Sequence, residues 1–107
     1  MTTAHGTRFQ LMVLYDWKAG IDAQRIAVHA QRIRALPSLV PGLIEVRFGP
    51  RLCGHPQGES EGWDHAAVMV FARHADFVAF GATRAHDDVA IELVADLERI
   101  SSVGFAG

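Results

Sequence analysis

The sequence predicts a single α+β domain in which a four-stranded antiparallel sheet carries its helices on one face. A length of 107 residues is enough for one modest core and too short for two domains. Several short segments alternate apolar and polar residues, as strands do, while others repeat apolar residues at helical spacing. These segments follow one another in the order strand, helix, strand, strand, helix, strand.

The first strand is expected at Phe9–Trp17, because every second residue there is apolar. Its more strongly apolar face comprises Phe9, Leu11, Val13, Tyr15 and Trp17. A turn follows, and Asp22 is placed to cap a helix that ends at Pro37. The inward stripe of this helix comprises Ile26, Ala30, Ile33 and Leu36.

Two further strands are expected at Leu43–Arg51 and Asp64–Ala72. Between them, Cys53–Gly62 is rich in glycine and polar residues and is typical of a mobile loop, with a lid role left open. The strand at Asp64–Ala72 is apolar on both faces, so neither of its faces is suited to water.

The last third of the chain is expected to form two helices and a strand. A short helix over Ala75–Ala82 precedes a break at residues 83–85, and a longer helix follows over His86–Arg99. Asp87 and Asp88 suit the positive end of the longer helix. The β-prone stretch Ile100–Phe105 is the fourth strand.

This order of elements is that of the split βαβ, or ferredoxin-like, unit. The face of the sheet away from the helices would carry a contiguous apolar patch, formed by Met12, Leu14, Val68 and Val70. No residues remain to build a third layer over it. We therefore expect a homodimer in which two copies pack through this open sheet face into a dimeric α/β barrel.

Composition excludes several classes of function. A net charge of −2 and scattered arginines offer no basic surface for nucleic acid. No apolar run approaches the roughly 20 residues that span a membrane. A single cysteine, Cys53, rules out an internal disulfide and fits a cytoplasmic protein. Residues 1–7 are expected to form a disordered tail, and residues 8–107 the domain.

The ordered features of the chain resemble those of the stress-responsive α/β-barrel (Dabb) domain family. The resemblance covers about Phe9–Phe105. It rests on Trp17-Lys18-Ala19-Gly20-Ile21-Asp22, Leu36-Pro37, Pro41-Gly42, Gly62-Trp63-Asp64-His65 and Ala85-His86. It implies a ferredoxin-like protomer and a homodimeric barrel, with no established activity in most members of the family.

One branch of the family is similar to a polyketide cyclase, whose pocket lies between the sheet and the helices. By position, this resemblance carries a strand histidine to His65 and a helix histidine to His86. The branch's other histidine falls on Leu11 and its tyrosine on Phe80, so neither of those groups is present. The family's His-Pro-x-His pattern is Thr83-Arg84-Ala85-His86 here and lacks its first histidine.

Proton abstraction beside a carbonyl needs a base and a donor for the developing enolate oxygen. His86 and His65 are the candidate catalytic residues, and His86 has an alternative structural role in ordering the break before its helix. Protonated His65 or the Tyr15 hydroxyl is a candidate donor. Candidate pocket-lining residues are Leu11, Tyr15, Trp17, Trp63 and Phe80, although the two tryptophans also suit core packing. The other histidines lack the spacing of a ligand set, so we expect no metal and no cofactor.

Three functions remain open. The first is a homodimer that binds a small apolar molecule in a pocket near His65 and His86. The second is a cofactor-independent enzyme, cyclase-like or monooxygenase-like, acting on a polyketide-like compound. The third is a structural or stress-protective dimer without a ligand.

Overall fold

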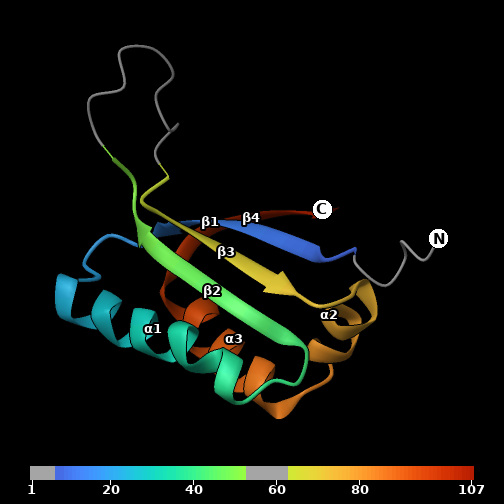
Figure 1. Ribbon diagram of the computed structural model, residues 1–107. Coiled ribbons are helices and arrows are strands. Elements are labelled where there is room, and N and C mark those ends of the chain that lie inside the picture. Colours follow the sequence, from blue (N-terminus) through green and yellow to red (C-terminus); the bar gives the residue numbers. More distant parts are fainter. Residues whose placement is uncertain (1–6, 53–62) are drawn as a thin grey trace.

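The computed structural model describes residues 7–52 and 63–107 of the chain. The elements are β1 (Phe9–Trp17), α1 (Ala23–Ala35), the 3-10 turn η2 (Leu36–Ser38), β2 (Leu43–Pro50), β3 (His65–Phe71), α2 (His74–Phe80), α3 (Arg84–Asp96) and β4 (Leu97–Ala106). The strands lie in the order β2-β3-β1-β4, and all neighbours are antiparallel. The helices cover one face of the sheet (Figure 1). The predicted ferredoxin-like α+β fold is confirmed.

The core lies between the sheet and the helices, because alternate residues of the central strand β1 face that side. Val13 and Tyr15 of β1 are buried against Ile33 of α1 and Leu93 of α3. A second group of buried side chains surrounds Phe71, which is fully enclosed at the end of β3. The inward face predicted for β1 is therefore the core face.

Helix α1 begins and ends where the sequence indicates. The carboxylate of Asp22 accepts a hydrogen bond of 2.8 Å from the backbone N–H of Arg25, which caps the first turn. Pro37 lies in the 3-10 turn that follows the helix. Ala30, Ile33 and Leu36 are buried as expected.

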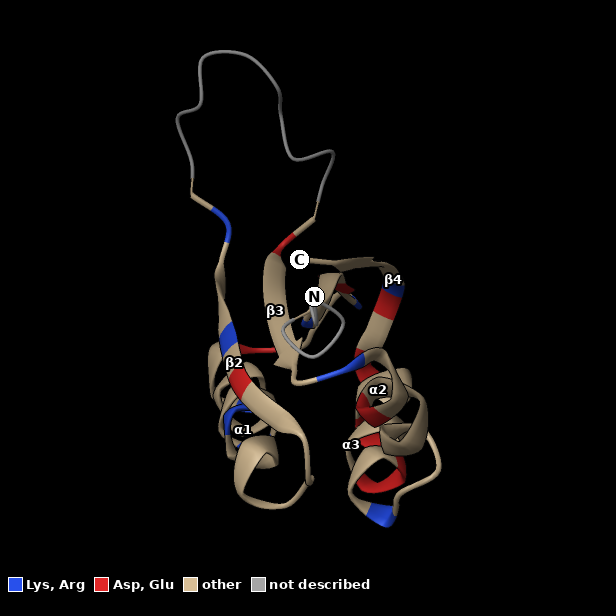
Figure 2. Cartoon of the chain, turned by 45° about the vertical axis from the view of Figure 1, so that its right-hand side comes forward, with Lys and Arg blue, Asp and Glu red and all other residues tan. Residues whose placement is uncertain are grey.

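A buried polar cluster joins α1 to α3. The Nε2–H of His29, a residue only 1% exposed, donates to Oδ2 of Asp96 over 2.6 Å. The same oxygen accepts from Nε of Arg25 over 2.6 Å, and Arg25 also donates to Glu92 over 2.7 Å. The hydrogen bonds from His29 and Arg25 hold the pKa of Asp96 below its usual range. Figure 2 shows the acidic residues of α3 and the basic residues of α1 on neighbouring helices.

The last helix and strand both begin earlier than the sequence predicts. Helix α3 starts at Arg84 rather than His86, because the Thr83 hydroxyl accepts the His86 backbone N–H over 3.1 Å and caps the helix. The predicted helix end at Arg99 is wrong. Residues from Leu97 onward pair with β1, so ladder hydrogen bonding overrides the helical preference of Glu98 and Arg99. Helix α2 likewise ends at Phe80 rather than Ala82.

The outer face of the sheet carries the apolar row that the sequence places there. Met12 of β1 lies between Val68 of β3 and Val103 of β4 in the strand register. Met12 is 42% exposed and Val103 is 60% exposed. Phe105 lies on the same face, opposite Gln10. Nothing within the chain covers this row in the described residues.

Three features expected from the sequence involve residues outside the described ranges: most of the N-terminal tail (residues 1–6), the loop at 53–62 and Cys53. In the described part of the chain, no helix combines the length and apolar character that crossing a membrane requires.

We predict that Asp96→Asn lowers the melting temperature by several degrees, because it leaves Arg25 and His29 facing a neutral amide. Asp88→Asn is the control: Asp88 forms an exposed pair with Arg84 at 3.9 Å, and its loss should have little effect.

The difference between wild type and Asp96→Asn should depend on pH. A carboxyl whose pKa is lowered on folding contributes stability above its ordinary pKa near 4 and loses it as the pH falls through the folded value. Thermal unfolding followed by circular dichroism should therefore show the difference shrinking at acid pH. A difference that is constant from pH 7 to the acid limit would contradict the assignment.

Candidate functional site

A cavity of about 290 Å³ lies between the inner face of the sheet and helices α1 and α3. Its walls are mainly apolar. β1 contributes Leu11, Val13 and Tyr15, while α3 contributes His86, Val89, Ala90, Leu93 and Val94. Val94 is 72% exposed and Ile100 of β4 is 57% exposed, so the cavity opens to solvent where α3 and β4 diverge.

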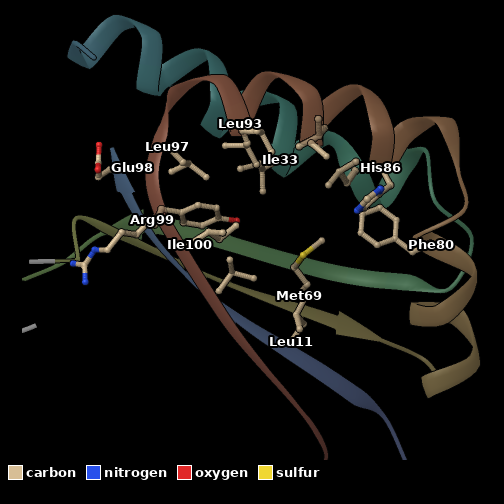
Figure 3. A pocket seen from close by; sticks show the side chains of 16 residues that line it. Leu11, Ile33, Met69, Phe80, His86, Leu93, Leu97, Glu98, Arg99 and Ile100 are labelled. Carbon is tan, nitrogen blue, oxygen red and sulfur yellow. The ribbon is translucent and has the colours of Figure 1, made fainter. Parts of the chain in front are cut away.

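His86 lines this cavity from the first turn of α3. Its ring meets the Phe80 ring edge-on, with centroids 5.0 Å apart (Figure 3). Its Nδ1 lies 3.1 Å from Oδ1 of Asp87. Because a carboxylate only accepts, Nδ1 carries the proton in this contact, and the lone pair of Nε2 is left for a ligand. The structural role that the sequence left open for His86, ordering the break before its helix, is filled by its backbone, because its N–H donates to the Thr83 hydroxyl that caps α3.

Tyr15 lines the same cavity and is 3% exposed. Its ring stacks on Trp17, with centroids 6.0 Å apart, and packs at a tilt against Phe48 at 5.5 Å. Burial raises the pKa of Tyr15, so the hydroxyl is neutral throughout the physiological range.

Two charged residues at the rim direct their charges away from the cavity. Figure 3 shows Glu98 and Arg99 pointing outward. Nε of Arg99 donates to Oδ2 of Asp16 over 2.9 Å, and its guanidinium lies 4.2 Å from the centre of the Trp63 ring. The polar groups that the lining directs to the cavity are therefore those of Tyr15 and His86.

The structure does not bring His65 to this cavity. His65 lies directly opposite Tyr15 in the strand register, on the side toward β2. Its Nδ1 accepts a hydrogen bond of 3.0 Å from Nε1–H of Trp17, and its ring stacks on Phe48 at 5.3 Å. It lines a separate hollow against α1, together with Ala27 and Arg34. The expectation that one pocket holds both histidines does not match this placement, since His86 lines the cavity beside α3 and His65 lines the hollow beside α1.

The environment of His65 also disfavours the protonated form that the donor role requires. Burial lowers the pKa of His65, and the nearby carboxylate of Asp64 opposes that effect only in part. The bond from Trp17 requires an unprotonated Nδ1. His65 is therefore a neutral, structural group that joins the start of β3 to the end of β1.

The five residues predicted to line the pocket divide into two groups. Leu11, Tyr15 and Phe80 line the cavity, while Trp17 and Trp63 do not. Trp17 is buried against His29, with ring centroids 5.2 Å apart. Trp63 lies under Arg99 instead.

Sequence reasoning did not identify His29 as part of the core. The signal was present, because His29 lies three residues after Ile26 and four before Ile33, on the buried stripe of α1.

In the described residues, no group of three or more histidine, cysteine or acidic side chains is arranged to hold a metal ion.

Comparisons with known proteins agree with this architecture. No curated protein matches the chain by sequence. A hydroxynitrile lyase from Passiflora edulis superposes with a TM-score of 0.86 at 20% identity, covering 94% of this chain and 93% of the lyase. A dimeric ferredoxin-like protein of unknown function from Thermobifida fusca superposes with a TM-score of 0.80 at 20% identity, covering 100% and 97%.

A Dabb family protein from Mesorhizobium loti with a ferredoxin-like fold is similar at a TM-score of 0.72 and 13% identity, covering 92% of this chain and 95% of that one. At these sequence identities, the three structural similarities show a shared fold and nothing more. The family model of the stress responsive A/B barrel domain matches residues 10–103, which is most of the chain. The protein therefore belongs to the stress-responsive A/B barrel domain (Dabb) family.

Proposed function

We propose that this protein is a cytoplasmic homodimer that binds a small, mostly apolar molecule in the cavity between α3, β1 and β4. The observation that carries the proposal is the cavity itself, because protein interiors are otherwise packed to near-crystalline density. At about 290 Å³ it is roughly twice the size of an engineered cavity that takes up benzene. A molecule of about two fused rings fits this space.

The position of the cavity also favours binding. It opens between the exposed side chains of Val94 and Ile100, so a ligand reaches it without unfolding the core. The walls supply apolar contact, while His86 and Tyr15 supply polar atoms. A concave, mainly apolar site with a few converging polar groups is the usual form of a small-molecule site.

We propose that a second copy of the chain packs against the outer face of the sheet. The central row of Val68, Met12 and Val103 is apolar. The edge beside it carries Glu45 and Arg47, so an apolar centre has a polar rim, which is the usual arrangement of a protein–protein interface. The dimeric state of the similar Thermobifida fusca protein supports the same arrangement.

Acid–base catalysis at His86 is the second candidate function. The observation that favours it is the contact with Asp87, which orients the ring and leaves Nε2 unprotonated on a side chain that lines the cavity. Phe80 and Leu11 provide no polar group for a cyclase-like or monooxygenase-like reaction, so Tyr15 would have to donate to a developing oxyanion.

The cavity proposal predicts that Ala90→Phe weakens binding of the neutral fluorophore N-phenyl-1-naphthylamine at least tenfold, because the added ring fills the cavity. Ala95→Phe places the same ring on the exposed side of α3 and should bind like wild type. The measurement is the fluorescence gain on titration. Equal affinities in both variants, or no gain with wild type, would favour the ligand-free structural dimer instead.

The dimer proposal predicts that the wild-type protein sediments at twice the protomer mass of 11.7 kDa at micromolar concentration. Val68→Asp introduces a charge in the middle of the apolar row and should sediment as a monomer. Val78→Asp changes an exposed residue of α2 and should leave the dimer intact. A wild-type protein of 11.7 kDa would refute the homodimer.

The catalytic alternative predicts that wild type turns over a poly-β-keto substrate analogue and that His86→Ala lowers the rate at least a hundredfold, the usual contribution of a general base. His65→Ala should leave the rate within a few-fold of wild type, because His65 lies outside the cavity. The measurement is product formation by chromatography, and equal rates for wild type and His86→Ala would exclude His86 as a base.

A further inference from the structure

The hydroxyl of Tyr15 is a buried polar group that the fold itself does not use. Tyr15 is 3% exposed, yet its hydroxyl forms no hydrogen bond with any residue in the ranges 7–52 and 63–107. Its ring is well packed, stacked on Trp17 and tilted against Phe48. Phenylalanine would make the same ring contacts, so packing does not account for the oxygen.

The hydroxyl oxygen is open to the cavity. In the described part of the chain, no fully enclosed side-chain oxygen or nitrogen lacks a partner. The Tyr15 oxygen lacks one, so it must remain accessible, and the cavity is the space that Tyr15 lines. A hydroxyl that reaches the cavity and is paired with no described protein group is free to exchange a hydrogen bond with a ligand atom there.

The charges around the cavity indicate which kind of ligand atom this is. Glu98 lies at the rim beside the Tyr15 end, and Asp87, in the first turn of α3, contacts His86. The guanidinium of Arg99 is held by Asp16 and Trp63, away from the cavity. An anionic group would enter an apolar site with Glu98 at its rim and, among the described residues, no lysine or arginine directed into it. The site therefore favours a neutral oxygen.

The two polar groups of the cavity come from different elements, Tyr15 from β1 and His86 from α3. Leu11, which packs with the cluster around Phe80, precedes Tyr15 by four residues of β1, a distance of about 13 Å along a strand. His86 contacts Phe80 at that far end. The apolar side chains that line the rest of the cavity hold the body of the molecule.

We propose that the ligand is a neutral molecule with an aromatic or alicyclic body of about two rings, which presents a ketone, aldehyde or hydroxyl oxygen to the Tyr15 hydroxyl. This inference rests on the proposed function of the cavity. It assigns Tyr15 as the residue that determines specificity for an oxygenated ligand over a hydrocarbon.

The test compares three probes of nearly equal shape: 2-acetylnaphthalene, 2-isopropenylnaphthalene and 2-naphthoate. Each displaces N-phenyl-1-naphthylamine from wild type, Tyr15→Phe and His86→Ala. In Tyr15→Phe, the affinity ratio of ketone to alkene should fall about fivefold, the factor that one net hydrogen bond contributes. The ratio should not change in His86→Ala, and naphthoate should bind most weakly to wild type.

The stability of the unliganded variant gives a second readout. Tyr15→Phe should melt at the wild-type temperature or above it, because no hydrogen bond within the described chain is lost. A lower melting temperature together with weaker binding of all three probes would make Tyr15 merely structural and would overturn the inference.

The remaining outcomes distinguish the two proposals. An unchanged ketone-to-alkene ratio in Tyr15→Phe, or naphthoate binding as tightly as the ketone, overturns the role of Tyr15 while the cavity remains a binding site. A ratio that falls in His86→Ala instead assigns the oxygen to His86. If wild type binds neither the fluorophore nor any probe, the proposed function fails, and the inference fails with it.

Discussion

The hydrogen bonds that Arg25 and His29 donate to Asp96 hold together the corner of the molecule on which the other elements depend. It joins the start of α1 to the last residue of α3. The backbone carbonyl of Asp96 also accepts a hydrogen bond of 2.9 Å from Lys18, just after β1. β4 begins at the next residue, so the position of Asp96 joins helices α1 and α3 to strands β1 and β4. The two donors stabilise the buried carboxylate, and removal of any one of the three groups leaves a buried polar group without its partner.

This corner explains where the cavity lies. The chain turns directly from α3 into β4, so the helix and the strand diverge from a fixed point and leave a space between them. Side chains at the closed end, such as Leu93 and Leu97, are buried. Val94 and Ile100, on either side of the corner, are exposed and lie at the mouth of the cavity. The two faces of the sheet thus have different roles: the inner face forms the core and cavity, and the outer face is the surface proposed for a second copy.

The candidate site was only partly predictable, and the reason lies in the sheet. The resemblance to the family led to His86, Leu11 and Phe80, and all three line the cavity. It also led to His65, which the register places opposite Tyr15 and toward β2. Alternation along a strand shows which face a residue occupies but not its position across the sheet. The buried aromatic contacts of Trp17 with His29 and His65 are likewise invisible in a local pattern.

The sequence by itself determined the strands, the capped helix α1, their order and the apolar outer face, since these follow from local periodicity and capping. It also marked the end of the chain as β-prone, although it placed the start of β4 at Ile100 rather than Leu97. Only the tertiary structure decided that Asp96 is buried between Arg25 and His29 and that the Tyr15 hydroxyl has no partner within the described residues. The contacts of Asp96 join residues about 70 positions apart, and the surroundings of the Tyr15 hydroxyl depend on how strands and helices pack, which neither spacing nor composition encodes.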